Sequence, residues 1–159
     1  MFYGADIDSL DLSCLNTSNV TTFDSMFHGC VINNATTIDC SNFDTTSAIS
    51  MLDMFFNCNW ITSLDLSSFN TPNLTNCDNM FFNCRTLIEL DLSNFDMTNV
   101  PEPTEEEHSY YYMFTECSSL KVVYVDNCND ITVDKLQNAL HSSFSLSTYK
   151  GRKALVKEG

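Results

Sequence analysis

The chain has 159 residues, of which 43% are hydrophobic and 12% aromatic, enough to bury one compact core. It carries 7 lysines and arginines against 21 aspartates and glutamates, a formal net charge of −14. Residues 1–120 contain one cation, Arg85, whereas residues 121–159 contain six cations and four carboxylates. Because an acidic surface repels phosphate groups, we expect neither nucleic acid nor an anionic membrane face as a partner. No apolar run is long enough for membrane insertion.

A short motif recurs along the chain in steps of 28, 26, 26 and 33 residues. Its four copies and one degenerate copy are Leu10-Asp11-Leu12-Ser13, Ile38-Asp39-Cys40-Ser41, Leu64-Asp65-Leu66-Ser67, Leu90-Asp91-Leu92-Ser93 and Val123-Tyr124-Val125-Asp126. A period of this size indicates a solenoid, because each unit is too small to bury its own apolar side and stacks on its neighbours instead.

Two spacings of apolar residues occur within each unit. The spacing of Leu90 and Leu92 predicts a short strand with one buried face. Residues spaced by three, three and one, such as those at 74, 77, 80 and 81, predict a short helical turn. We therefore expect an α/β solenoid of about five coils. A ribbon of parallel strands should form one side, and short helical turns the other.

The clearest unit carries a recognisable pattern. It reads Met80-Phe81-Phe82-Asn83-Cys84-Arg85-Thr86-Leu87-Ile88-Glu89-Leu90-Asp91-Leu92-Ser93-Asn94-Phe95-Asp96. This pattern resembles the bacterial surface-protein repeat of the BspA-like leucine-rich-repeat family, over roughly residues 1–125. The resemblance implies a leucine-rich-repeat solenoid that serves in adhesion or protein–protein contact, without a cofactor and without catalytic residues. Such arrays also occur in phage-encoded proteins.

The two ends differ from the repeat. The solenoid, residues 1–125, starts in mid-repeat, because Met1-Phe2 matches the Met-Phe pair inside later units. We expect upstream sequence or another chain to cover this N-terminal edge, since an open edge exposes unpaired backbone. The first residues have no features of a signal peptide. Residues 126–159 are predicted to be a C-terminal cap: a helix with Thr132 available as its N-cap, then a hairpin around Lys150-Gly151.

The eight cysteines fit a reduced core better than a disulfide framework. Seven of them occupy predicted core positions: Cys30, Cys40, Cys58, Cys77, Cys84, Cys117 and Cys128. Only Cys14 falls at a position that we expect to be exposed. Because neighbouring coils lie about 5 Å apart, a bridge between them is geometrically allowed. There is no Cys-x-x-Cys pair and no histidine at ligand spacing, so we expect no metal site.

The strand positions predict an acidic face. The candidate binding residues on it are Asp11, Ser13, Asp39, Ser41, Asp65, Ser67, Asp91, Ser93 and Tyr124. Carboxylates stacked in adjacent coils repel one another unless water, a cation or a partner screens them. The face is therefore either a solvated surface or the site of a basic or hydroxyl-rich ligand. It lacks the Asp-x-Asp-x-Asp-Gly spacing of a calcium loop.

An insertion at about residues 101–112 is the second candidate contact site. Its charged and aromatic residues are Glu105, Glu106, Glu107, Tyr110, Tyr111 and Tyr112. Insertions in solenoids often lie at binding surfaces, and glutamates beside tyrosines offer charge steering next to amphipathic contact area. The alternative is a tolerated surface loop.

These features favour a non-enzymatic module without a cofactor that binds a protein or a glycan. Its location would be a cell surface, the extracellular space or a virion. An alternative is an assembly subunit of a phage particle, whose N-terminal edge another chain covers or which self-assembles through that edge. The three histidines are scattered, and no Ser–His–Asp or Cys–His pairing places a catalytic site on one face.

Overall fold

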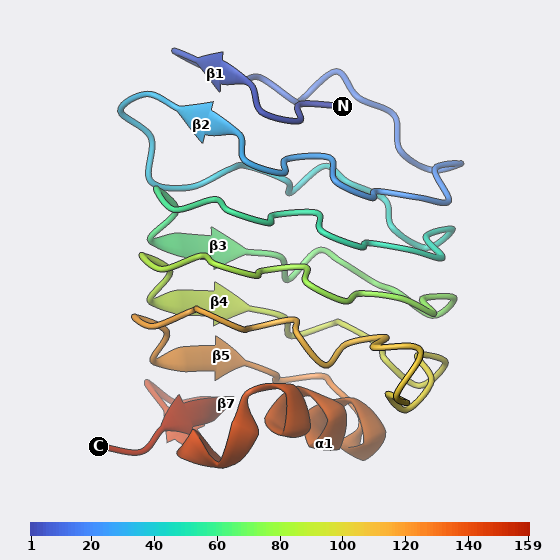
Figure 1. Cartoon of the computed structure of the whole chain (residues 1–159), viewed down its shortest axis with the longest axis vertical. Helices are drawn as coiled ribbons and strands as arrows, with labels where there is room; N and C mark the ends of the chain where they lie inside the picture. Colours follow the sequence, from blue (N-terminus) through green and yellow to red (C-terminus); the bar gives the residue numbers. More distant parts are fainter.

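The computed structural model describes residues 1–159, apart from the side chain of Ser142. Most of the chain is turns and irregular backbone between short strands, and it winds in successive circuits from the N-terminus to the C-terminus (Figure 1). We call each circuit a coil and number the coils by the motif copy that each contains, from Leu10–Ser13 in the first to Val123–Asp126 in the fifth. Helix α1 (Asp130–Ala139) and the short 3-10 helix η1 (His141–Ser143) lie at the C-terminal end. Within the described residues, no helix is long and apolar enough to cross a membrane.

Strands from successive coils pair in parallel and in register. The strands are β1 (Asp6–Ile7), β2 (Val31–Ile32), β3 (Ser63–Asp65), β4 (Glu89–Asp91), β5 (Val122–Tyr124), β6 (Phe144–Tyr149) and β7 (Arg152–Lys157). One sheet pairs β1 with β2, and the other has the order β3-β4-β5-β7-β6. In the second sheet Leu64 lies beside Leu90, and Leu90 beside Val123, so equivalent repeat positions are aligned.

The predicted strand position is correct in the last three copies and wrong in the first two. Strands β1 and β2 precede their motifs, and residues 10–12 and 38–40 form no strand. The shift of β2 has a reason in the sequence, because the stretch from Cys30 to Ile38 is two residues longer than that from Cys58 to Leu64. A turn at Asn34, with a φ of 66°, takes up the extra length. The pairing between the second and third coils is therefore interrupted.

The expectation of short helical turns opposite the strands is wrong. The chain there forms consecutive β-turns: the N–H of Cys30 donates to the carbonyl of Phe27 at 2.9 Å, and Gly29 has a φ of 60°. A positive φ at the third residue is the mark of a type II turn. Alternate N–H groups instead donate to the next coil, as Phe27 does to the carbonyl of Met54 at 2.9 Å. These N–H groups are thus unavailable for bonds within a helix.

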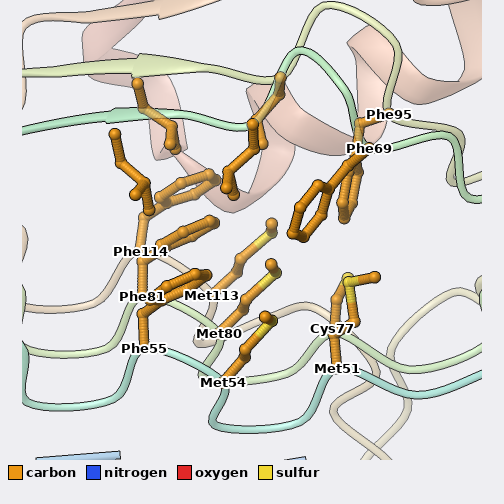
Figure 2. Close-up of a cluster of buried hydrophobic side chains, with 14 of the residues drawn as sticks. Met51, Met54, Phe55, Phe69, Cys77, Met80, Phe81, Phe95, Met113 and Phe114 are labelled. Carbon is orange, nitrogen blue, oxygen red and sulfur yellow. The ribbon is translucent and has the colours of Figure 1, made fainter. Parts of the chain in front are cut away.

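The core consists of columns of like side chains (Figure 2). Five phenylalanine rings stack with centroids 5.3–5.7 Å apart: Phe2, Phe27, Phe55, Phe81 and Phe114. Figure 2 shows three of these rings beside the methionine column of Met54, Met80 and Met113. Because each side chain packs on its equivalent in the next coil, the repeat period fixes the packing.

A column of buried threonines also connects the coils, and apolar periodicity did not predict it. The hydroxyls of Thr17, Thr45 and Thr71 each donate at 3.0 Å to a main-chain carbonyl of the next coil. In the following coil Met97 takes this position, and its N–H donates to the hydroxyl of Thr132 on α1 at 2.9 Å. Helix α1 is thus also attached through a threonine hydroxyl and the main chain, but here the hydroxyl accepts the bond.

The C-terminal segment closes the last coil. The side chain of Asn129 accepts the N–H of Thr132 at 2.8 Å, so Asn129 and not Thr132 is the N-cap of α1. The ammonium of Lys135, although buried, donates to the carbonyls of Met97 and Val100. Strands β6 and β7 form a hairpin with a two-residue turn at Lys150–Gly151, where φ is 50° and 80°. Strand β7 then pairs antiparallel with β5.

All eight cysteines are free thiols, seven buried and Cys14 exposed, as the repeat register predicts. The thiols of Cys58, Cys84 and Cys117 donate at 3.0–3.1 Å to main-chain carbonyls of the preceding coil. Burial raises the pKa of Cys40, Cys58 and Cys117 to about 12. These thiols therefore stay protonated at neutral pH.

Replacing Thr71 by valine should destabilise the fold by about 1–3 kcal/mol, because the main-chain N–H and carbonyl of Asp96 both lose their partner. Urea unfolding followed by the fluorescence of Trp60 measures this. The matched control is Thr36→Val at an exposed position, with an expected change below about 0.5 kcal/mol. Equal effects of the two substitutions would contradict the role of the threonine column.

A thiol reagent added to the native protein at pH 8 should modify one cysteine quickly, Cys14, and reach all eight only in denaturant. Quantitative absorbance of the released thiolate measures the count. The Cys14→Ser variant should show no fast phase. A fast phase of more than one equivalent in the native protein would mean that buried cysteines are readily accessible to the reagent.

Candidate functional site

Three cavities follow one another along the outer face of the strands. The first, of about 390 Å³, has Asp8 and Asp39 in its wall. The second, of about 330 Å³, is lined by Asp39 and Asp65, and the third, of about 340 Å³, by Asp65 and Asp91. Thr37 lines all three. Neighbouring cavities also share an aspartate, Asp39 or Asp65, and we call the three together the acidic groove.

The predicted binding residues divide into three groups along this face. Those of the second and third coils lie together in the middle cavity: Asp39, Ser41, Asp65 and Ser67. Asp91 and Tyr124 line the third cavity, and Ser93 is buried and donates to Asp91. Asp11 and Ser13 are exposed in the first coil, outside the walls of the three cavities.

A local turn holds each aspartate of the column in place. The carboxylates of Asp11, Asp39, Asp65 and Asp91 each accept the N–H of the serine two residues later, at 2.9–3.0 Å. The backbone bond from Ser13 lowers the pKa of Asp11, and the side-chain and backbone bonds from Ser41 lower that of Asp39. The carboxylates thus share one orientation from coil to coil. Those of Asp11 and Asp39 are ionised at neutral pH.

A cation of the chain itself occupies the C-terminal end of the face. The Nη2 atom of Arg152 lies 2.7 Å from Asp91 Oδ2 and donates to Ser93 Oγ at 2.8 Å. Its Nε atom donates to Asp126 Oδ2 at 2.6 Å. The guanidinium carbon lies 4.2 Å from the ring centroid of Tyr124. Two carboxylates, a hydroxyl and an aromatic ring thus hold one guanidinium group.

This arrangement corrects the expectation of an exposed face in the fourth and fifth coils. Asp91, Ser93 and Tyr124 are only 9%, 3% and 7% exposed. Arg152 covers them because β7 pairs with β5, which places the first residue of β7 over Asp91 and Asp126. The accessible part of the acidic column therefore ends at Asp65.

The second cation of the hairpin, Lys150, pairs with another carboxylate at the C-terminal end of the acidic face. Lys150 Nζ lies 2.7 Å from Glu89 Oε1, and the hydroxyl of Tyr124 donates to Glu89 Oε2 at 3.2 Å. The hydrogen bond from Lys150 lowers the pKa of Glu89. The sequence gives one indication of these pairs, which is the concentration of cations after residue 120. The partners themselves depend on the register of β7 against β5, which local patterning does not determine.

The insertion at 101–112 lies partly in the core. Tyr110 is buried, and its hydroxyl donates to Glu102 at 2.6 Å; Lys135 of α1 lies 3.6 Å from the same carboxylate. Tyr112 is half-buried, and its N–H donates to Asp78 at 3.0 Å. The predicted contact residues that remain exposed are Glu105, Glu106, Glu107 and Tyr111. The insertion thus connects the last coils to α1 and presents a smaller surface than the sequence suggests.

Among the residues that the structure describes, no group of three or more histidine, cysteine, aspartate or glutamate side chains could hold a metal ion.

Residues 1–123 match the model of the family described as Mycoplasma protein of unknown function, DUF285, and the chain belongs to this family. A search of curated proteins found no match. A search of solved structures found none either.

Replacing Arg152 by glutamine should destabilise the protein by about 1–2 kcal/mol at pH 7, since Asp91 stays covered without its cation. The expected change is modest because the Arg152 side chain is 38% exposed, so solvent screens its ion pairs. Burial opposes ionisation of Asp126, but the bonds from Arg152, the Lys153 N–H and Ser93 together outweigh it and lower the pKa of Asp126. This stabilisation is complete above the unfolded pKa and is lost as the pH falls through the folded pKa.

The measurement is the urea midpoint of wild type and Arg152→Gln between pH 7 and pH 3. The matched control is Arg85→Gln, which removes an exposed pair with Glu116 at 3.4 Å and should change stability by less than about 0.5 kcal/mol. A difference between wild type and Arg152→Gln that persists undiminished at pH 3 would show that the cation does not act through these carboxylates.

Proposed function

We propose that the chain is a short leucine-rich-repeat solenoid of the BspA-like type and works as a non-enzymatic interaction module. Its acidic groove binds a protein segment that carries arginine or lysine, at a cell surface or in the extracellular space. In support of the solenoid, equivalent positions 26 residues apart pair in the second sheet, and like side chains form columns through the core.

The observation that carries the proposed function is the binding of Arg152 at one end of the acidic face. Its guanidinium bridges two adjacent coils, contacting Asp91 and Ser93 of one and Asp126 and Tyr124 of the next. This contact is an intramolecular example of the ligand chemistry that the face accepts. A cation between carboxylates also removes the repulsion that stacked aspartates cause.

The repeat positions of Asp91 and Ser93 are open in the second and third coils. There they are Asp39 and Ser41, then Asp65 and Ser67, and all four line the middle cavity of about 330 Å³. No cation is bonded to Asp39 or Asp65 among the described residues. The groove thus offers two carboxylates and two hydroxyls to a cation from another molecule.

The chemistry favours a protein segment over a glycan. Two carboxylates in adjacent coils match the forked donors of a guanidinium or the compact charge of an ammonium. A neutral glycan would meet the serine hydroxyls and would leave both charges unpaired. An aminosugar polymer carries ammonium groups and is therefore the glycan that the test must include.

The first test uses a fluorescent peptide that contains two arginines, with a citrulline peptide of the same sequence as the neutral analogue. Fluorescence anisotropy should show binding of the arginine peptide that weakens with salt, and at least about tenfold weaker binding of the citrulline peptide. The double variant Asp39→Asn, Asp65→Asn should lose at least about tenfold in affinity. Asparagine still accepts the serine N–H, so the turns are retained.

The matched control is the double variant Glu105→Gln, Glu106→Gln, which changes the net charge equally on the exposed part of the insertion. It should bind within about twofold of wild type if the groove is the site. Equal losses in both double variants would mean that the peptide responds to net charge alone. Binding of chitosan oligomers but not of the arginine peptide would transfer the proposal to a glycan ligand.

A further inference from the structure

Strand β6 (Phe144–Tyr149) is an open edge of the larger sheet. In the order β3-β4-β5-β7-β6 it has one neighbour, β7. The two-residue turn makes Tyr149 and Arg152 a hydrogen-bonded pair, so odd-numbered residues of β6 bond to β7. In agreement, the carbonyl of Lys153 and the N–H of Lys157 bond to Val125 and Lys121, the two residues that flank β5 on the other side of β7. The N–H and carbonyl groups of Leu146 and Thr148 therefore point away from the sheet.

These groups have no partner among the described residues, and nothing in the strand discourages pairing. Beyond Phe144, whose carbonyl accepts the Gln137 side chain at 3.3 Å, the outward backbone groups of β6 make no bond. The strand contains no charged residue, no proline and no bulge, which are the usual means of blocking an edge. Leu146 lies opposite the buried Leu155 and is still 49% exposed. The edge thus combines free backbone groups with an uncovered apolar side chain.

The edge is complementary to itself. When β6 pairs antiparallel with its own copy, outward residues must face outward residues. A two-fold axis at Leu146 satisfies this, because it sets Leu146 against Leu146 and Phe144 against Thr148 of the other copy. The two exposed leucines then lie about 5.5 Å apart between their Cα atoms, on the same face of the sheet.

The charge distribution favours contact between copies at the C-terminal end of the molecule. Residues 1–120 hold 17 carboxylates and one cation, so contacts through the coils repel two copies. Strand β6 is neutral, and Lys150, Lys153 and Lys157 lie in or beside its hairpin. Figure 1 places the hairpin at the end of the stack opposite the first coil. Joining two copies at β6 keeps their acidic coils far apart.

We propose that the chain forms a symmetric dimer in which strand β6 pairs antiparallel with β6 of a second copy, about a two-fold axis at Leu146. The sheet then runs without interruption through both copies, with five strands from each. Because the axis is perpendicular to the sheet, both acidic grooves face the same side. A ligand with two basic segments gains avidity from this arrangement. The dimer does not depend on what the groove binds, and its tests contain no ligand.

The first experiment is sedimentation velocity of the full chain in reducing buffer from about 1 to 500 µM, since a six-residue edge makes a small interface with a dissociation constant on the order of 10–100 µM. Wild type should shift from monomer to dimer and no further. Leu146→Lys should raise the dissociation constant at least about tenfold, because it sets two ammonium groups against each other. Thr148→Pro, which removes one outward N–H, should do the same.

The matched control is Ile131→Lys on α1, where a side chain of equal exposure, 50%, receives the same charge. It should dimerise as wild type does, and circular dichroism should confirm that all variants fold. A wild type that stays monomeric to 500 µM would overturn the proposal, and so would a dimer that survives both Leu146→Lys and Thr148→Pro.

A covalent test defines the register. In a Cys14→Ser background, Leu146→Cys should form an intermolecular disulfide under mild oxidation with a copper–phenanthroline catalyst and dissolved oxygen, because the paired Cα atoms lie within bridging distance. Ile131→Cys in the same background should not. A disulfide yield no higher at residue 146 than at residue 131 would exclude this register and the two-fold axis at Leu146.

Discussion

The structure depends on backbone hydrogen bonds between coils. A single coil has few bonds of its own, because its strands have two or three residues and its other side is a series of β-turns. Apart from the bonds that close those β-turns, its N–H and carbonyl groups bond to the coils before and after it, on the strand side and on the turn side alike. The phenylalanine, threonine and cysteine columns follow from that alignment, since bonded coils place equivalent side chains next to one another.

The sequence alone predicts the columns well and the backbone between them poorly. Every buried cysteine and the parallel pairing at Leu64 and Leu90 follow from aligning the copies. Helical turns do not form, because the spacing of three, three and one also fits β-turns whose left-handed residues, such as Gly29 and Asn57, recur every coil. The shift of β2 depends on where two extra residues are absorbed, and periodicity contains no information on that.

In the candidate site, too, the repeat predicts the local turns but not the contacts between segments remote in sequence. The turn between Asp39 and Ser41 repeats in each copy and is local, so the repeat itself predicts a column of aspartates. The end of that column depends on contacts remote in sequence: Arg152 reaches Asp91 only because β7 pairs with β5. Likewise Lys135 of α1, remote in sequence, lies beside the Glu102 carboxylate that accepts the hydroxyl of the buried Tyr110. Long-range pairing therefore decides which predicted residues stay accessible.

The repulsion between stacked carboxylates is balanced differently in different coils. Toward the C-terminus it supplies its own cations, Arg152 and Lys150, and the repulsion becomes a set of ion pairs. In the second and third coils it supplies none, and the charge of Asp39 and Asp65 is balanced only by water and salt. A solvated carboxylate pair costs little in stability, and the basic partner that we propose would meet it without first displacing an internal cation. Under the proposed function, the open half of the groove is therefore the half at which a basic partner would bind.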